Sequence, residues 1–186
     1  MIIKPVDDKL DLFLIEDILP LELLNRIRTE DFWGYDWEKQ EMQSRWNRRR
    51  LLPDSSSPLG EVDVHYNHVL DQLEEVVGIK FTHKTCWSSF WLDYDGFNCT
   101  IHEDGAERNY NPLMAMQIYL SESIDQLGTV WYHGPMGKVR YAFPYKINTG
   151  YLMLNHSGQW HGMLNNVPPG HLRLSSYTYF GQFEYK

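Results

Sequence analysis

The sequence predicts a mainly β protein, built as a sandwich, jelly roll or barrel, with helices near the N-terminus covering one sheet. Beyond Phe81, runs of β-branched and aromatic residues are punctuated by Gly, Pro and Asn, which is typical of short strands and turns. Before that point, apolar residues recur at helical spacing. The 186 residues are 42% hydrophobic and 15% aromatic, enough for one core, and predict a single domain spanning 1–186.

The first part of this domain, 1–80, is expected to be a helical support region. Leu12–Ile15 is a short apolar run that suits a strand. A helix is expected to begin near Pro20, because proline fits the first helical turn. A second helix is expected over Glu61–Val77, with Gly78 ending it. Its apolar face would consist of Val62, Tyr66, Val69, Leu73 and Val76.

The second part, 81–186, is expected to form the jelly-roll core and to hold the functional site. Short strands at close intervals, separated by turn residues, are the pattern of a sandwich, jelly roll or barrel. The eight expected strands are Thr85–Tyr94, Asn98–His102, Leu113–Leu120, Thr129–Tyr132, Lys138–Phe143, Gly150–Leu154, His161–Leu164 and Leu172–Phe180.

Two of these strands have one apolar face and one more polar face, since side chains alternate along a strand. The apolar rows are Met114, Met116, Ile118 and Leu120 on one strand and Leu172, Leu174 and Phe180 on the other. The opposite rows are Ala115, Gln117 and Tyr119, and Arg173, Ser175, Tyr177 and Tyr179. We expect the apolar rows to face the helices and the opposite rows to line a polar cavity inside the sandwich.

Composition argues against several classes of function. With 17 basic and 25 acidic residues the net charge is −8, which argues against a general nucleic-acid binder. Cys86 and Cys99 are too few for a disulfide scaffold and are expected to be free thiols. The N-terminus lacks the apolar stretch of a signal peptide, and no apolar run approaches the length of a membrane helix. We therefore expect a soluble, cytoplasmic protein without a membrane partner.

His102 and Asp104 are the first candidate metal ligands, because side chains two apart on a strand point the same way. Chance alone supplies about one such His-x-acid pair in a chain of this composition. The pair gains weight from His161, since two histidines and one carboxylate are the known facial ligand set of non-haem Fe(II) oxygenases. His156, in a predicted turn, is the main rival for the second histidine. Two weaker rivals are His133 and His171.

Arg173 is expected on the inner face of the sandwich, where a buried guanidinium requires an anion. No acidic residue lies on the same face of its own strand. A dicarboxylic cosubstrate would supply the missing negative charge.

Four segments in this order resemble the Fe(II)/2-oxoglutarate-dependent oxygenase superfamily, most closely its prolyl-hydroxylase-like branch. They correspond to the family's Tyr-x-x-Gly lead-in, which is compact here as Tyr94-Asp95-Gly96, and to its His-x-Asp pair, its Tyr-Leu strand, its distal histidine and its Arg-x-Ser strand. The resemblance covers about Thr85–Phe180, roughly half of the chain. The segments are 94–104, 116–121, 128–131 and 161–177.

The resemblance implies a cupin-like jelly roll, the double-stranded β-helix, with helices buttressing its larger sheet. It implies that Fe(II) is held by the catalytic residues His102, Asp104 and His161. Arg173 would pair with the distal carboxylate of 2-oxoglutarate, as a bidentate guanidinium can. The other implied cosubstrate residues are Tyr119, Ser175, Tyr94 and Tyr177.

The implied activity is that of a dioxygenase that consumes O2, converts 2-oxoglutarate to succinate and CO2, and hydroxylates an unactivated C–H bond. The substrate would be a prolyl or other peptidyl residue, or a free small molecule. Two alternatives remain. One is a cupin-type metalloenzyme that does not use 2-oxoglutarate, and the other is a jelly-roll module that binds sugar or peptide.

The segment 32–50 matches neither a helical nor a strand pattern, but it ends in a basic patch. The patch consists of Arg45, Arg48, Arg49 and Arg50 with Trp46. It is suited to an acidic substrate or a nucleic acid. The alternative is a patch packed by its tryptophan and balanced by Glu38 and Glu41.

Overall fold

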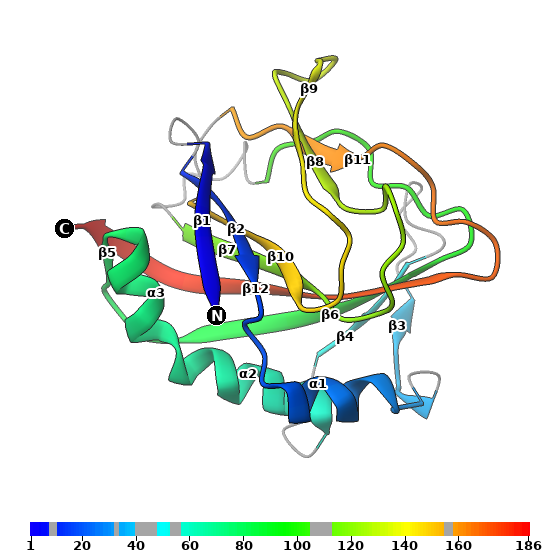
Figure 1. Cartoon of the computed structure of the whole chain (residues 1–186), viewed down its shortest axis with the longest axis horizontal. Coiled ribbons are helices and arrows are strands. Elements are labelled where there is room, and N and C mark those ends of the chain that lie inside the picture. Colours follow the sequence, from blue (N-terminus) through cyan, green and yellow to red (C-terminus); the bar gives the residue numbers. More distant parts are fainter. Residues whose placement is uncertain (8–10, 32–33, 40–47, 53–56, 105–112, 155–157) are drawn as a thin grey trace.

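The computed structural model describes the chain except for residues 8–10, 32–33, 40–47, 53–56, 105–112 and 155–157. Two antiparallel sheets lie face to face, and the helices cover the outer face of the larger sheet (Figure 1). This confirms the predicted mainly β architecture with N-terminal helices as a buttress. Among the described residues, no helix combines the length and the apolar character needed to cross a membrane.

Among the described residues, the larger sheet has nine strands and the smaller sheet has three. The path through the larger sheet is β1 (Ile2–Asp7), β2 (Leu12–Glu16), β10 (Thr149–Leu154), β7 (Leu113–Tyr119), β12 (Leu172–Tyr185), β6 (Cys86–Tyr94), β4 (Arg48–Leu51) and β3 (Glu38–Lys39), with β5 (Ile79–Phe81) pairing β12. The smaller sheet is β11 (His161–Met163), β8 (Thr129–Tyr132) and β9 (Val139–Ala142). The helices are α1 (Leu21–Arg28), α2 (Pro58–His68) and α3 (Leu70–Val77).

The main core lies between the larger sheet and the helices. It includes the apolar row of β7 and Leu174 and Phe180 of β12, packed with buried residues of all three helices. The alternation in the sequence is therefore confirmed in the structure. The inner face is only partly polar, because Ala115, Trp131, Tyr151 and their neighbours form a second apolar cluster between the sheets.

The helix predicted over Glu61–Val77 is two helices, separated at Val69 (φ −99°, ψ 4°), whose N–H bonds to the carbonyl of Tyr66. The break shifts the register of the second helix. Val76 is consequently 53% exposed rather than part of the apolar face. Gly78 ends α3 as predicted, with the positive φ (75°) that glycine adopts easily.

Seven of the eight predicted strands are confirmed, and the exception is Asn98–His102. This segment meets β11 through Cys99, opposite Met163, and through His102, opposite His161. Three residue steps separate Cys99 from His102, but only two separate His161 from Met163. The extra residue in the segment 98–102 interrupts a regular ladder of hydrogen bonds.

The region 1–80 also supplies strands that the sequence did not predict. β1 is an edge strand, where Pro5 is tolerated. β3 and β4 fall in the segment that matched no pattern.

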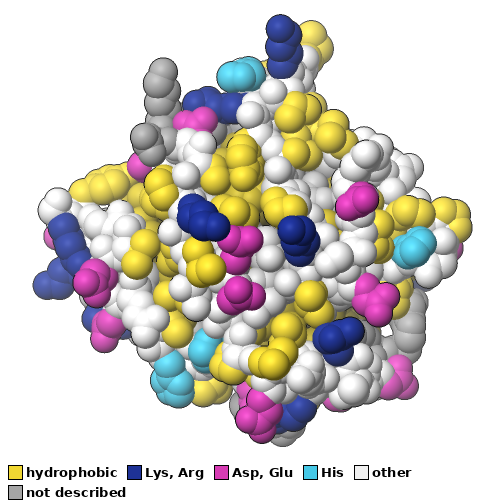
Figure 2. All heavy atoms as spheres, in the orientation of Figure 1, with side chains coloured by type: hydrophobic (Ala, Val, Ile, Leu, Met, Phe, Trp, Pro, Cys, Tyr) yellow, Lys and Arg dark blue, Asp and Glu magenta, His cyan; other side chains and the backbone are white. Residues whose placement is uncertain are grey.

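On the face shown in Figure 2, the described acidic and basic side chains are interspersed and form no extended basic surface.

The two faces of α3 predict unequal stability effects. Leu73→Ala should lower the free energy of unfolding by about 2–5 kcal/mol, because Leu73 is fully buried and its truncation leaves a cavity. Val76→Ala, on the exposed side of the same helix, should change the free energy by less than about 0.5 kcal/mol. Urea unfolding followed by tryptophan fluorescence measures both, and equal losses would contradict this assignment of the core.

Candidate metal centre

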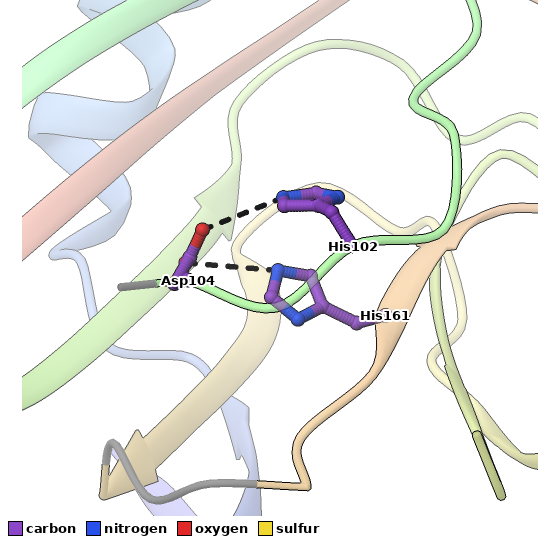
Figure 3. A group of neighbouring side chains, drawn as sticks. All are labelled: His102, Asp104 and His161. Carbon is purple, nitrogen blue, oxygen red and sulfur yellow. Dashed lines mark ion pairs between the residues drawn. The ribbon is translucent and has the colours of Figure 1, made fainter. Parts of the chain in front are cut away.

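Three side chains that could hold a metal ion converge between the sheets. His161 is the first residue of β11, and the single bridge between His102 and His161 brings the two imidazoles together. Asp104 follows two residues after His102, and all three point toward one another (Figure 3). One ligand atom from each lies within 4.8 Å of the others. The Nε2 atoms of His102 and His161 are 3.4 and 3.6 Å from the carboxylate of Asp104.

Backbone carbonyls fix the orientation of both imidazoles. The Nδ1 atom of His102 is 2.8 Å from the carbonyl oxygen of Thr100, and that of His161 is 2.8 Å from the carbonyl oxygen of Gln159. A carbonyl oxygen only accepts, so each Nδ1 carries hydrogen and each Nε2 faces the carboxylate. Metal-binding histidines are commonly held by this kind of bond.

The charges of the three side chains are strongly coupled. Burial opposes ionisation of Asp104, but the two histidines and Tyr177 outweigh it and hold the pKa of that carboxyl well below its usual range. Burial also opposes the charged form of His102, yet the hydrogen bond to Asp104 raises the pKa of His102 to about 10. Burial lowers the pKa of His161. A proton therefore lies on Nε2 of His102, at the position where a cation would replace it.

Two aromatic residues contact the triad: Tyr177 binds Asp104, and Trp131 stacks on His161. The hydroxyl of Tyr177 donates to Oδ2 of Asp104 at 2.5 Å. Burial raises the pKa of Tyr177, so this hydroxyl keeps its proton. The ring of Trp131 stacks on His161 with centroids 5.0 Å apart. Two imidazole nitrogens and one carboxylate, each held by a further contact, fit a divalent transition metal with positions left toward the pocket.

The pocket beside this triad lies on the inner face of the larger sheet. It contains polar groups from β7, β8 and β12 and aromatic rings from β6, β10 and β12. The lining residues are Arg48, Trp91, Cys99, His102, Asp104, Gln117, Thr129, Tyr151, His161, Gly162, Met163, Arg173, Tyr177 and Tyr179.

Arg173 is buried in this pocket, as predicted, but it has an acidic partner. Asp93 stands directly opposite Arg173 in the pairing of β6 with β12, and Nη1 donates to Oδ2 at 2.6 Å. The carboxylate also accepts from Nε of Arg48 at 2.5 Å and is 0% exposed. The expectation that burial of Arg173 requires an external anion is therefore wrong, because Asp93 on the neighbouring strand supplies the negative charge. Two guanidiniums around one carboxylate still leave one positive charge.

The outer edge of Arg173 is held only loosely. Its Nη2 lies 3.4 Å from both Oε1 of Gln117 and Oγ1 of Thr129, which is long for a hydrogen bond. The hydroxyl of Thr129 donates to the same Gln117 oxygen at 2.9 Å. Two donors thus point at one neutral acceptor in the pocket wall.

Three of the predicted cosubstrate residues do not line the pocket. The hydroxyl of Tyr119 is bound to Thr129, accepting from its N–H and donating to its hydroxyl. Ser175 is fully buried and accepts from Nε2 of Gln117. Tyr94 follows Asp93 on β6 and so lies on the opposite face of the sheet. Only Tyr177 of this group reaches the metal ligands.

The rival histidines do not join the cluster among the described residues. His133 and His171 are exposed and contribute no ligand atom there. His156 lies outside the described residues. Asp93 and Thr129 were missed by the sequence analysis, although alternation along β6 from Trp87 and Trp91 would have placed Asp93 on the inner face.

Comparison of the sequence with protein-family models and with curated proteins finds no match. The structure does match solved structures. A Pseudomonas putida prolyl-4-hydroxylase has a TM-score of 0.68 at 14% identity, with 93% of each chain covered. A Trichoplax adhaerens prolyl hydroxylase, in complex with a hypoxia inducible factor peptide fragment, has a TM-score of 0.69 at 9% identity, covering 92% of this chain and 84% of that one. The chain has the prolyl-hydroxylase fold.

This fold extends to HygX from Streptomyces hygroscopicus, solved with nickel and 2-oxoglutarate bound. HygX matches with a TM-score of 0.63 at 10% identity, covering 94% of this chain and 84% of that one. The prolyl-hydroxylase-like jelly roll expected from the sequence motifs is thereby confirmed as the fold.

Metal binding should depend on the triad in a graded way. His161→Ala should abolish high-affinity binding of Ni(II), because it removes a ligand. Tyr177→Phe should weaken binding by about 10–100-fold, since it removes only the hydrogen bond that orients Asp104. His171→Ala, at an exposed position, is the control. Isothermal titration calorimetry with Ni(II) measures all three, and undiminished affinity in His161→Ala would exclude this triad as the metal site.

Proposed function

We propose that this protein is an Fe(II)- and 2-oxoglutarate-dependent dioxygenase that hydroxylates an unactivated C–H bond and converts 2-oxoglutarate to succinate and CO2. The observation that carries the proposal is the presence of two features in one pocket. One is the triad of His102, Asp104 and His161, and the other is the buried arginine cluster with its excess positive charge.

The triad residues would hold the metal from one side, which leaves the opposite positions open to the pocket. When bound there, Fe(II) supplies the O2 activation and C–H oxidation of the reaction. Tyr177 keeps Asp104 in place, and the Thr100 and Gln159 carbonyls keep both imidazoles in the orientation that ligation requires. The nickel and 2-oxoglutarate in the structure of HygX support this assignment.

The distal carboxylate of 2-oxoglutarate would bind at the outer edge of Arg173. An incoming carboxylate is a stronger acceptor than the Gln117 amide oxygen, so it would take over the donors of Arg173 and Thr129. Its negative charge would neutralise the arginine cluster. Tyr119 would act through Thr129, rather than by a direct bond, and Ser175 would hold the other end of the Gln117 amide.

The alternatives account for less of the pocket. A metalloenzyme without 2-oxoglutarate would have no use for the excess positive charge around Asp93. A sugar- or peptide-binding module would have no use for the triad. The substrate is proposed as a peptidyl residue or a small molecule. The Trichoplax adhaerens enzyme was solved with a peptide fragment, and HygX has also been solved with hygromycin B.

The proposal predicts a visible charge-transfer band when both Fe(II) and 2-oxoglutarate are added without O2, and succinate after O2 is admitted. Arg173→Ala should weaken 2-oxoglutarate binding at least about 100-fold, because it removes the charged donor from a buried site. Asp93 would still be paired with Arg48, which favours retention of the fold. Arg140→Ala, whose partner Asp7 lies away from the pocket, is the matched control.

The band in Arg173→Ala separates the candidate functions. If the band forms without 2-oxoglutarate, the protein is a metalloenzyme of another kind. The same conclusion follows if Arg173→Ala binds 2-oxoglutarate with unchanged affinity. If neither component binds, the binding-module alternative is favoured.

A further inference from the structure

Strand β4 places two arginines on the pocket side of the larger sheet. Arg48 pairs in register with Asp93 and Arg50 with Trp91, whereas Leu51 points into the core beneath the helices. Residues two apart on a strand are about 7 Å apart and share a face. Arg48 lines the pocket, and Arg50 lies two residues along the same face of β4, opposite Trp91, which also lines the pocket.

The two arginines differ in what balances their charge. Arg48 is paired with Asp93. Arg50 donates from Nε and Nη2 to a single neutral acceptor, the hydroxyl of Ser89, at 3.1 and 3.0 Å. Within the described part of the chain, no carboxylate forms an ion pair with Arg50. Glu38 lies opposite it in the β3–β4 register, but it is exposed and makes no ion pair with Arg50.

Arg50 is nevertheless held in a defined orientation. Ser89 binds one edge of its guanidinium, and the carbon centre of the group lies 5.8 Å from the Trp91 ring centroid. An arginine oriented before binding loses less conformational entropy when it meets a ligand. It is also a local positive charge on a chain of net charge −8. A partly buried cation that has no acidic partner within the described part of the chain attracts an anion at this position.

Ser89, which binds Arg50, lies opposite Tyr177 in the pairing of β6 with β12, and Tyr177 belongs to a row of aromatic rings that ends at Asp104. Trp87 is 50% exposed and stacks on Tyr179, with centroids 5.8 Å apart. Tyr179 packs edge-on against Tyr177 at 5.0 Å, and Tyr177 donates to Asp104. Trp91, Tyr177 and Tyr179 all line the pocket. The apolar body of a substrate would lie against these rings while its charged group reaches Arg50.

We propose that Arg50 binds a carboxylate of the substrate, so that the enzyme acts on acidic molecules whose carboxylate lies outside the metal pocket. The inference rests on the proposed function and specifies its substrate class. A guanidinium with one edge fixed still presents N–H donors to a carboxylate, the pairing that arginine forms best. The carboxylate belongs to an acidic residue of a peptide or to a free carboxylic acid.

The test compares acidic and neutral probes on protein loaded with Ni(II) and 2-oxoglutarate, followed by tryptophan fluorescence. One arm uses proline-centred hexapeptides with flanking Asp and Glu, against the same peptides with Asn and Gln. The other arm uses N-acetyl amino acids against their amides. In at least one of the two arms, we expect the acidic probe to bind at least about 10-fold more tightly than its neutral counterpart. Arg50→Gln should remove this preference, and Arg50→Lys should keep part of it. Arg28→Gln, at an exposed position of α1, is the control and should leave the preference unchanged.

Absence of an acidic preference in both arms, or a preference that survives Arg50→Gln, would overturn the proposal. The anaerobic Fe(II) and 2-oxoglutarate band of each variant distinguishes this failure from that of the proposed function. A normal band without an acidic preference refutes only the role of Arg50. A missing band in the unaltered protein refutes the dioxygenase itself.

Discussion

The rest of the pocket depends on the two buried ion pairs that the carboxylate of Asp93 forms with the guanidiniums of Arg48 and Arg173. The carboxylate joins three neighbouring strands, β4, β6 and β12, on the inner face of the larger sheet. Removing Asp93 would leave two buried guanidiniums without their carboxylate, and breaking a buried ion pair in this way typically costs about 3–5 kcal/mol. Asp93 binds Nη1 of Arg173 and the Leu127 carbonyl binds Nε, which leaves Nη2 toward Gln117 and Thr129 in the pocket wall. The contacts that stabilise this part of the sheet thus also position the arginine to which we assign anion binding.

The metal ligands are positioned largely by the backbone. Each histidine bonds through Nδ1 to the carbonyl oxygen two residues before it, and the backbones of the two histidines bond to each other. The third ligand follows from the short spacing between His102 and Asp104. The arrangement therefore needs few side-chain partners, of which Tyr177 and Trp131 are the clearest.

The sequence predicted the triad and the inner faces of β7 and β12, because both follow from short spacings and strand alternation. It did not predict the partner of Arg173, since that contact depends on the register between strands far apart in the chain. Alternation along β6 places Tyr94 on the face away from the pocket, and the hydroxyl of Tyr119 is bonded to Thr129. The break at Val69 and the extra residue before His102 are local irregularities that periodicity does not detect. Strands β3 and β4 consist almost entirely of charged residues, so they lack the alternation of apolar and polar residues that predicts a strand.

The position of Arg48 has a consequence for how this fold can change over time. The N-terminal region looks like a separable support for the jelly roll, yet it contributes one of the two charges around Asp93. A chimera in which residues 1–80 were exchanged for a segment without an arginine at this position would inherit a buried carboxylate matched to Arg173 alone. The pocket would then be electrically neutral before any ligand arrived. The position of Arg48 therefore couples the two parts of the chain, even though the candidate metal ligands found among the described residues all lie in the second.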